Sequence, residues 1–166
     1  MWGRPVRSLK TLLLVRHAKS SWKHADLDDI DRPLNKRGAR DAPEMGRRLL
    51  ERSLVPDLIV SSPAVRALMT ASAIAREVSD TGDVVIEEGL YGAAPQDVLD
   101  IVAAFDDRFQ TAMVVGHNPT MTQLANSFSE TPIENVPTCG MLFIETTTWS
   151  SVDAARLLDF DYPRKP

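Results

Sequence analysis

The chain alternates short apolar runs with segments in which apolar residues recur every third or fourth position, and this feature restricts its fold most strongly. The short runs are typical of buried strands, and they cover residues 9–15, 58–60, 84–86 and 112–115. Strands that alternate with helices form a parallel or mostly parallel sheet covered by helices. We therefore expect an α/β protein, and its 166 residues fit a single domain spanning 1–166.

Prolines mark the expected starts of three helices. Pro63, Pro95 and Pro119 each follow a strand-like run or a turn. Proline suits the first helical turn because the N–H that it lacks would be unpaired there anyway. The segments after Pro95 and Pro119 also carry apolar residues at i, i+3, i+4 and i+7, which predicts one core-facing stripe on each helix.

Two further regions are less regular. Apolar residues between positions 35 and 52 follow a helical period, but Pro43 interrupts it, so the helix either kinks there or starts near Asp41. Residues 141–147 and 154–160 are typical of a hairpin, which we expect at one edge of the sheet.

Composition excludes several classes of protein. The longest unbroken apolar run has five residues, 101–105, whereas a membrane-spanning helix needs about 20. The formal charge of −4, without a basic run, argues against a nucleic-acid binder. The single cysteine, Cys139, cannot form an internal disulfide, and we interpret it as a buried strand residue. We expect a cytoplasmic protein with no cofactor, and the sequence does not indicate its oligomeric state.

Polar side chains that can take part in binding or catalysis follow three of the expected strands. Arg16 and His17 come directly after the first strand, and Arg66 lies one turn into the helix after the second. His117 follows the fourth strand. Ligands of parallel α/β sheets bind beyond the carboxyl ends of the strands, so we expect these four side chains to converge there.

The four residues suit phosphoryl transfer. Two guanidinium groups hold a phosphoryl group through charge-assisted hydrogen bonds, which leaves one imidazole free to attack phosphorus. A histidine with an ordinary pKa of about 6.5 is largely neutral at pH 7, and neighbouring cations favour that neutral form. His17 is therefore a credible nucleophile.

Four sequence blocks extend this pattern. They read LLLVRHAKSSW (12–22), DRPLNKRG (31–38), SSPAVRA (61–67) and VVGHNP (114–119). In this order and spacing they resemble the histidine phosphatase superfamily, which includes the phosphoglycerate mutases and the SixA-type phosphohistidine phosphatases. The resemblance implies a phosphoglycerate mutase-like fold, a three-layer α/β/α sandwich around a mostly parallel six-stranded sheet with one antiparallel strand.

The resemblance also implies a role for each candidate residue. His17 would become a transient phosphohistidine, and three side chains would hold the phosphoryl oxygens: Arg16, Arg66 and His117. Ser20 matches a hydroxyl that lies near the phosphate in relatives. The segment EEGLYG (87–92) is similar to a mutase segment that supplies the proton donor, which nominates Glu88.

Short length and the SixA-like signature favour one substrate, a phosphohistidine on another protein. A protonated phosphohistidine also depends less on a strong enzymatic acid than an alkyl phosphate ester does. The alternatives are a broad phosphomonoesterase acting on small phosphorylated metabolites, a mutase, a catalytically silent module that binds phospho-ligands, and a metal-dependent phosphoesterase.

An acidic stretch between residues 26 and 31 allows two interpretations, a site for a divalent cation or a solvated loop. We favour the solvated loop and predict no metal site. The nearby His24 is likewise interpreted as a loop residue.

Overall fold

The computed structural model describes residues 8–166, in which six strands form one sheet in the order β3-β2-β4-β1-β5-β6. Within this part of the chain, β5 is antiparallel to β1 and the remaining strands share the direction of β1, as expected. The pairing of β5 with β6 confirms the predicted hairpin at the sheet edge. The strands are β1 (Lys10–Arg16), β2 (Leu58–Ser61), β3 (Val85–Ile86), β4 (Thr111–Gly116), β5 (Met141–Thr146) and β6 (Arg156–Asp161).

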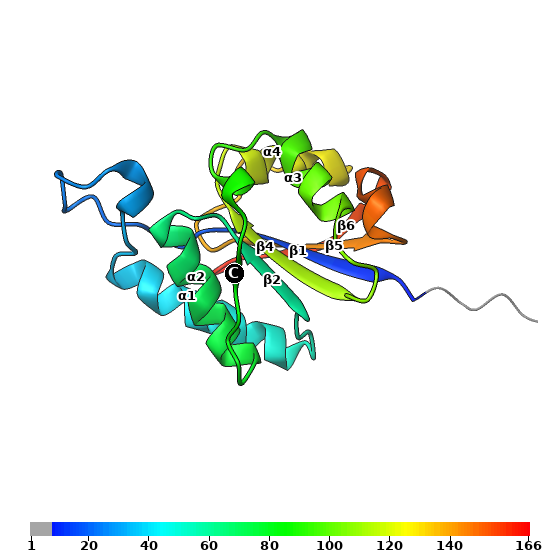
Figure 1. Ribbon diagram of the computed structural model, residues 1–166, viewed down its shortest axis with the longest axis horizontal. Helices are drawn as coiled ribbons and strands as arrows, with labels where there is room; N and C mark the ends of the chain where they lie inside the picture. The colour runs from blue at the N-terminus through cyan, green and yellow to red at the C-terminus, as the bar shows by residue number, and fades with distance from the viewer. Residues whose placement is uncertain (1–7) are drawn as a thin grey trace, which may run out of the picture.

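Helices cover both faces of the sheet (Figure 1). They are α1 (Lys36–Glu51), α2 (Val65–Val78), α3 (Pro95–Ala103) and α4 (Thr120–Phe128), with short 3-10 turns η1 (Asp29–Asp31), η2 (Glu88–Leu90) and η3 (Trp149–Ala154). Successive strand residues point to opposite faces. In β1, Leu13 and Val15 pack with α1 and α2, whereas Leu12 and Leu14 pack with α3 and α4. The fold is therefore the expected three-layer sandwich.

Of the two alternatives for the first helix, a start near Asp41 is wrong, because α1 begins at Lys36 and runs through Pro43. The Asn35 side chain accepts a hydrogen bond from the Gly38 N–H at 2.9 Å, so the helix has an N-terminal cap six residues earlier than expected. The helix continues through Pro43. Burial of its apolar face offsets the hydrogen bond that a proline inside a helix removes.

The proline rule locates the helices better than it locates their boundaries. Pro95 is the first residue of α3, as predicted. Pro63 and Pro119 precede α2 and α4, whose first residues are Val65 and Thr120. These two prolines therefore belong to the turns before their helices.

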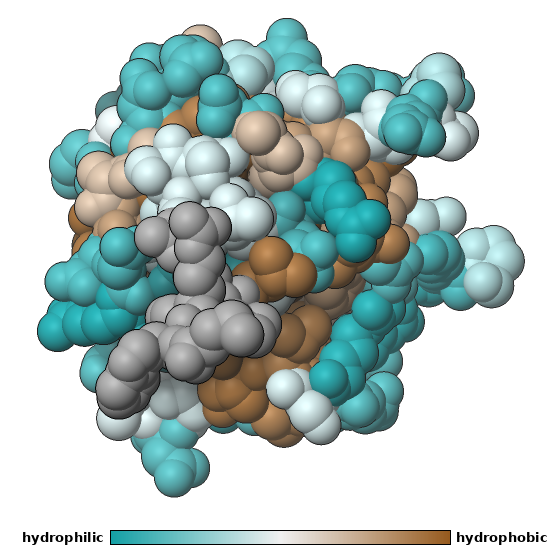
Figure 2. Space-filling model, turned by 90° about the vertical axis from the view of Figure 1, so that its right-hand side faces the viewer, coloured by the Kyte–Doolittle hydropathy of each residue, from teal (hydrophilic) through white to brown (hydrophobic). Residues whose placement is uncertain are grey.

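The two ends of the sheet differ. The amino end of β1 lies on the right in Figure 1, and Figure 2 views the molecule from that side, where a hydrophobic area lies among hydrophilic side chains. The carboxyl ends of β1 and β4 lie on the opposite side. In the described part of the chain, every helix is too short or too polar to span a bilayer.

Candidate active site

The structure brings the four predicted side chains together at the carboxyl ends of β1 and β4. Arg16 is the last residue of β1 and pairs with Gly116 of β4, so His17 and His117 extend from adjacent strands. Their ring centroids are 5.3 Å apart. Arg66, in the first turn of α2, donates a hydrogen bond from Nε to His17 Nε2 at 3.3 Å.

The hydrogen bonds of His17 determine which ring nitrogen can act as a nucleophile. Nδ1 lies 2.7 Å from the carbonyl oxygen of Ala18. Because a carbonyl oxygen can only accept, Nδ1 carries the proton and Nε2 keeps its lone pair. Burial, with smaller contributions from His117 and Arg66, lowers the pKa of His17 to about 3. His17 is therefore neutral at pH 7, with Nε2 facing Arg66.

His117 is prepared as a hydrogen-bond donor. Its Nε2 lies 2.7 Å from the Ser62 hydroxyl. That hydroxyl oxygen accepts from the Ala64 N–H and can donate its own hydrogen to Nε2. In the tautomer that receives this hydrogen bond, the proton of the neutral ring resides on Nδ1, where it can be donated to a ligand. Burial and the charge of Arg66 lower the pKa of His117 to about 4.

Two buried side-chain atoms in residues 8–166 have no hydrogen-bond partner, and both belong to this site. They are Arg16 Nε and His117 Nδ1. Arg16 is held in place because its Nη1 donates to the carbonyl oxygen of Val136 at 2.9 Å. A buried unpaired donor is unfavourable, and an anion between these atoms would satisfy both. The arrangement therefore fits a phosphoryl group beside His17.

Asp29 is a site residue that the sequence analysis missed. Its backbone carbonyl accepts from Arg66 Nη1 at 2.6 Å, and its carboxylate accepts from Arg66 Nη2 at 3.0 Å. The same carboxylate accepts from the Tyr91 hydroxyl at 2.7 Å and from Arg32 Nη1 at 2.9 Å. These donors, the Tyr91 hydroxyl first, hold the pKa of Asp29 well below its usual range.

The solvated-loop interpretation is incomplete for Asp29, whose side chain is about half exposed but also forms salt bridges with Arg32 and Arg66. A signal was available, because Asp29 lies three residues before Arg32 of the second sequence block. The partner Arg66 lies 37 positions away, however, and local sequence does not reveal that contact. In the part of the chain that the structure describes, no three His, Cys, Asp or Glu side chains are grouped so as to hold a metal ion.

Two backbone contacts position the segment that carries His17. A Cβ atom at Gly38 would overlap the carbonyl of Lys19, so glycine allows α1 to lie directly against this segment. The Cys139 N–H donates to the carbonyl oxygens of Arg16 and His17, at 3.1 Å each.

Cys139 is buried as expected, but it lies in a turn before β5 with φ of 62°, so its assignment to a strand is wrong. Burial raises the pKa of its thiol to about 12.

The two remaining candidates lie outside the group of four. The Ser20 hydroxyl accepts from Arg32, which links it to Asp29 rather than to His17. Glu88 begins η2 and is exposed, and its carboxylate accepts no hydrogen bond from the described residues. The side chain of this segment that reaches the site is Tyr91, whose ring meets that of His117 edge-on with centroids 5.7 Å apart.

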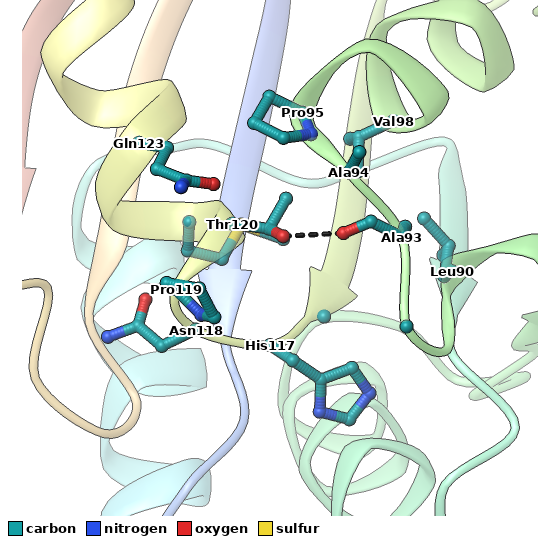
Figure 3. A pocket seen from close by; sticks show the side chains of 13 residues that line it. Leu90, Ala93, Ala94, Pro95, Val98, His117, Asn118, Pro119, Thr120 and Gln123 are labelled. Atoms are coloured by element: carbon teal, nitrogen blue, oxygen red, sulfur yellow. Dashed lines mark hydrogen bonds between the residues drawn. The ribbon is translucent and has the colours of Figure 1, made fainter.

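A cavity of about 380 Å³ lies beside His117, between the segment after η2 and the start of α4 (Figure 3). The hydroxyl of Thr120 donates to the carbonyl oxygen of Ala93 at 2.5 Å and so joins its two walls. Apolar side chains contribute much of the lining: Leu90, Ala93, Ala94, Pro95, Val98 and Met121. The cavity can take an uncharged group attached to a phosphoryl group.

Known proteins are similar to this chain in sequence and in fold. Residues 12–93 match the model of the histidine phosphatase superfamily (branch 1). An uncharacterised protein of Mycobacterium tuberculosis (strain ATCC 25618 / H37Rv) is 32% identical over 163 residues, which cover 90% of this chain and 100% of that protein.

Two solved structures resemble the whole chain. The putative phosphohistidine phosphatase SixA from Nakamurella multipartitia superposes with a TM-score of 0.82 at 26% identity, covering 95% of this chain and 98% of that one. The putative phosphohistidine phosphatase SixA from Agrobacterium tumefaciens gives 0.80 at 31% identity, covering 93% and 99%. The chain therefore belongs to the histidine phosphatase superfamily, as a SixA-like phosphatase.

Proposed function

We propose that this phosphatase removes the phosphoryl group from a phosphohistidine residue of a protein substrate, with His17 as the nucleophile. One observation carries the proposal: His17 holds its proton on Nδ1 and keeps the lone pair of Nε2, beside three side chains of which two, Arg16 and His117, each have a buried nitrogen without a partner. Arg16, Arg66 and His117 are the proposed ligands of the phosphoryl oxygens.

In the first step, His17 Nε2 forms a bond to phosphorus while the P–N bond of the substrate breaks. The leaving imidazole takes the electron pair of that bond and receives a proton from solvent or from Glu88. Arg66 Nε, which donates to Nε2 in the free protein, then donates to a phosphoryl oxygen. This step converts the neutral nucleophile into phosphohistidine.

In the second step, water attacks the phosphorus and the P–N bond to His17 breaks. Inorganic phosphate leaves, the water proton passes to phosphate or solvent, and His17 becomes neutral again. The low pKa of about 3 supports this return to the neutral imidazole.

The identity of the leaving group supports a phosphohistidine substrate. Imidazole leaves as a neutral molecule once it is protonated, so it needs little help from an enzymatic acid. The exposed position of Glu88 is compatible with such a substrate. The SixA names of the neighbours with 26% and 31% identity point in the same direction.

The proposal is tested by incubating the purified protein with a phosphohistidine-containing domain that carries labelled phosphate. We expect release of inorganic phosphate by the wild-type protein and none by His17→Ala, whose fold is checked by circular dichroism. Retention of label on the domain, together with rapid hydrolysis of sugar phosphates, would reject the protein substrate.

The cavity beside His117 favours a second candidate, hydrolysis of small phosphomonoesters, because it can hold the uncharged part of a metabolite. An alkyl ester needs a proton donor, so Glu88→Gln separates the candidates. For an ester substrate we expect a loss of about 100-fold or more if Glu88 donates the proton, and little change for phosphohistidine. The cytoplasmic location stays a prediction.

A further inference from the structure

Trp22 is unusually exposed for a large aromatic residue. Its relative exposure is 74%, the highest among the exposed large hydrophobic residues from 8 to 166. Tryptophan is enriched at the centres of protein interfaces because it buries a large apolar surface at a small cost in conformational entropy. An exposed indole is therefore a candidate contact for a partner.

The Trp22 ring is held in a fixed position. The guanidinium carbon of Arg32 lies 3.3 Å from the ring centroid, a cation–π contact. Arg32 is itself only 7% exposed. Its Nε donates to the carbonyl oxygen of Ser21, and its Nη2 donates to the Ser20 hydroxyl. The indole is thus presented in a prepared orientation, which reduces the entropy lost on binding.

A continuous series of contacts joins Trp22 to the catalytic pocket. Arg32 donates to Asp29, and Asp29 accepts from Arg66. Arg66 in turn donates to His17. Trp22 is therefore connected to the nucleophile through three side chains in succession.

The surroundings of Trp22 indicate the chemistry of its partner. Its loop carries one exposed lysine, Lys23, but also the exposed carboxylates of Asp26, Asp28, Asp29 and Asp31, and this excess of negative charge disfavours nucleic acid and anionic lipid. Because three side chains separate Trp22 from His17, a ligand that contacts both must extend well beyond its phosphoryl group. A polypeptide meets this requirement, whereas a small phosphorylated metabolite does not.

We infer that Trp22, held by Arg32, is the docking contact for the polypeptide around the phosphorylated residue, and that it contacts an apolar or cationic side chain of that polypeptide. This inference rests on the proposed function. It predicts that Trp22 contributes to recognition of a protein substrate and contributes nothing to the chemistry of the phosphoryl group.

The test compares two substrates with the same leaving group, a phosphohistidine-containing domain and phosphohistidine as the free amino acid. Trp22→Ala is expected to raise the KM for the domain about 10-fold or more with little change in kcat. Its kcat/KM for the free amino acid should stay within about twofold. Trp22→Phe, which keeps an aromatic ring over Arg32, should recover most of the affinity. The matched control is Leu158→Ala, an exposed apolar residue on β6.

A second readout does not depend on turnover. The domain should bind about 10-fold more weakly to the His17→Ala, Trp22→Ala protein than to His17→Ala alone. Equal losses on both substrates would mean that Trp22 acts through Arg32 on the site, and an unchanged KM would mean that the domain does not touch it. Either result overturns the inference about Trp22 and leaves the proposed function standing. A wild-type protein inactive on the domain overturns the proposed function as well.

Discussion

The two halves of the site, a strand side and a helix side, differ in whether the nitrogen atoms of their side chains already have hydrogen-bond partners. On the strand side, Arg16 and His117 each keep one buried nitrogen without a partner. On the helix side, all three guanidinium nitrogens of Arg66 donate, Nε to His17 and the terminal pair to Asp29. The strand side is thus open to an anion from outside, whereas the helix side is already fixed by an internal anion. We therefore propose that Arg16 and His117 hold the phosphoryl group, whereas Asp29 positions Arg66 to meet it.

The largest effect is expected from a change on the strand side. Arg16→Ala should lower kcat/KM by about 100-fold to 1,000-fold, because it removes a buried donor directed at developing negative charge. Steady-state kinetics and the inhibition constant of vanadate measure the loss. Inhibition by vanadate should weaken in parallel. A loss below about 10-fold would remove the distinction between the two halves.

The helix side is tested by Asp29→Asn, which keeps the shape of the side chain and removes its charge. Arg66 then loses its charged partner but keeps its hydrogen bond to the backbone carbonyl of residue 29, and we expect kcat to fall about 10-fold because the guanidinium is held less firmly. Asp31→Asn, an exposed carboxylate of the same loop, is the matched control and should change little. If Asp29→Asn instead bound vanadate more tightly than wild type, Asp29 would compete with the phosphoryl group rather than position Arg66.

Burial of the His17 imidazole predicts that the stability of the fold depends on pH. The pKa of His17 falls to about 3 in the folded chain, against about 6.5 when unfolded. Below pH 6.5 the unfolded chain therefore binds a proton that the folded chain does not, and stability decreases as the pH falls towards 3. Between pH 7 and pH 5, His17→Ala should lose about 2 kcal/mol less of its unfolding free energy than wild type, measured by urea titration. Parallel losses would show that His17 is not desolvated.

The smallest effect is expected from Tyr91→Phe, which removes one donor to Asp29 but keeps the ring against His117. A decrease in kcat of about threefold to tenfold is expected, which matches the net free energy of one ordinary exposed hydrogen bond. Combined with Asp29→Asn, it should add little, because both changes break the same hydrogen bond. Fully additive losses would indicate that Tyr91 acts on His117 instead.

Sequence periodicity predicted the layers of this fold because strands and helices are local signals. The alternation along β1 is visible in the chain, and its two sets of apolar residues pack on opposite faces. The residues after the strands were predictable for the same reason, since the carboxyl ends of parallel strands meet at one edge. Arg16, His17 and His117 follow from that rule.

Contacts between distant segments were not predictable. Asp29 resembles its neighbouring aspartates in sequence, and only the fold brings it to Arg66. Glu88 was selected by resemblance, yet the chain turns at η2 so that Tyr91 meets the site. The cap at Asn35 was also missed, because the proline inside α1 is the stronger local signal.

The most direct test of the central claim is to locate the phosphoryl group after brief mixing with a labelled phosphohistidine substrate and an alkaline quench. We expect label on the peptide containing His17, stable in base, lost in acid and absent from His17→Ala. Label on another residue, or undiminished turnover by His17→Ala, would contradict it.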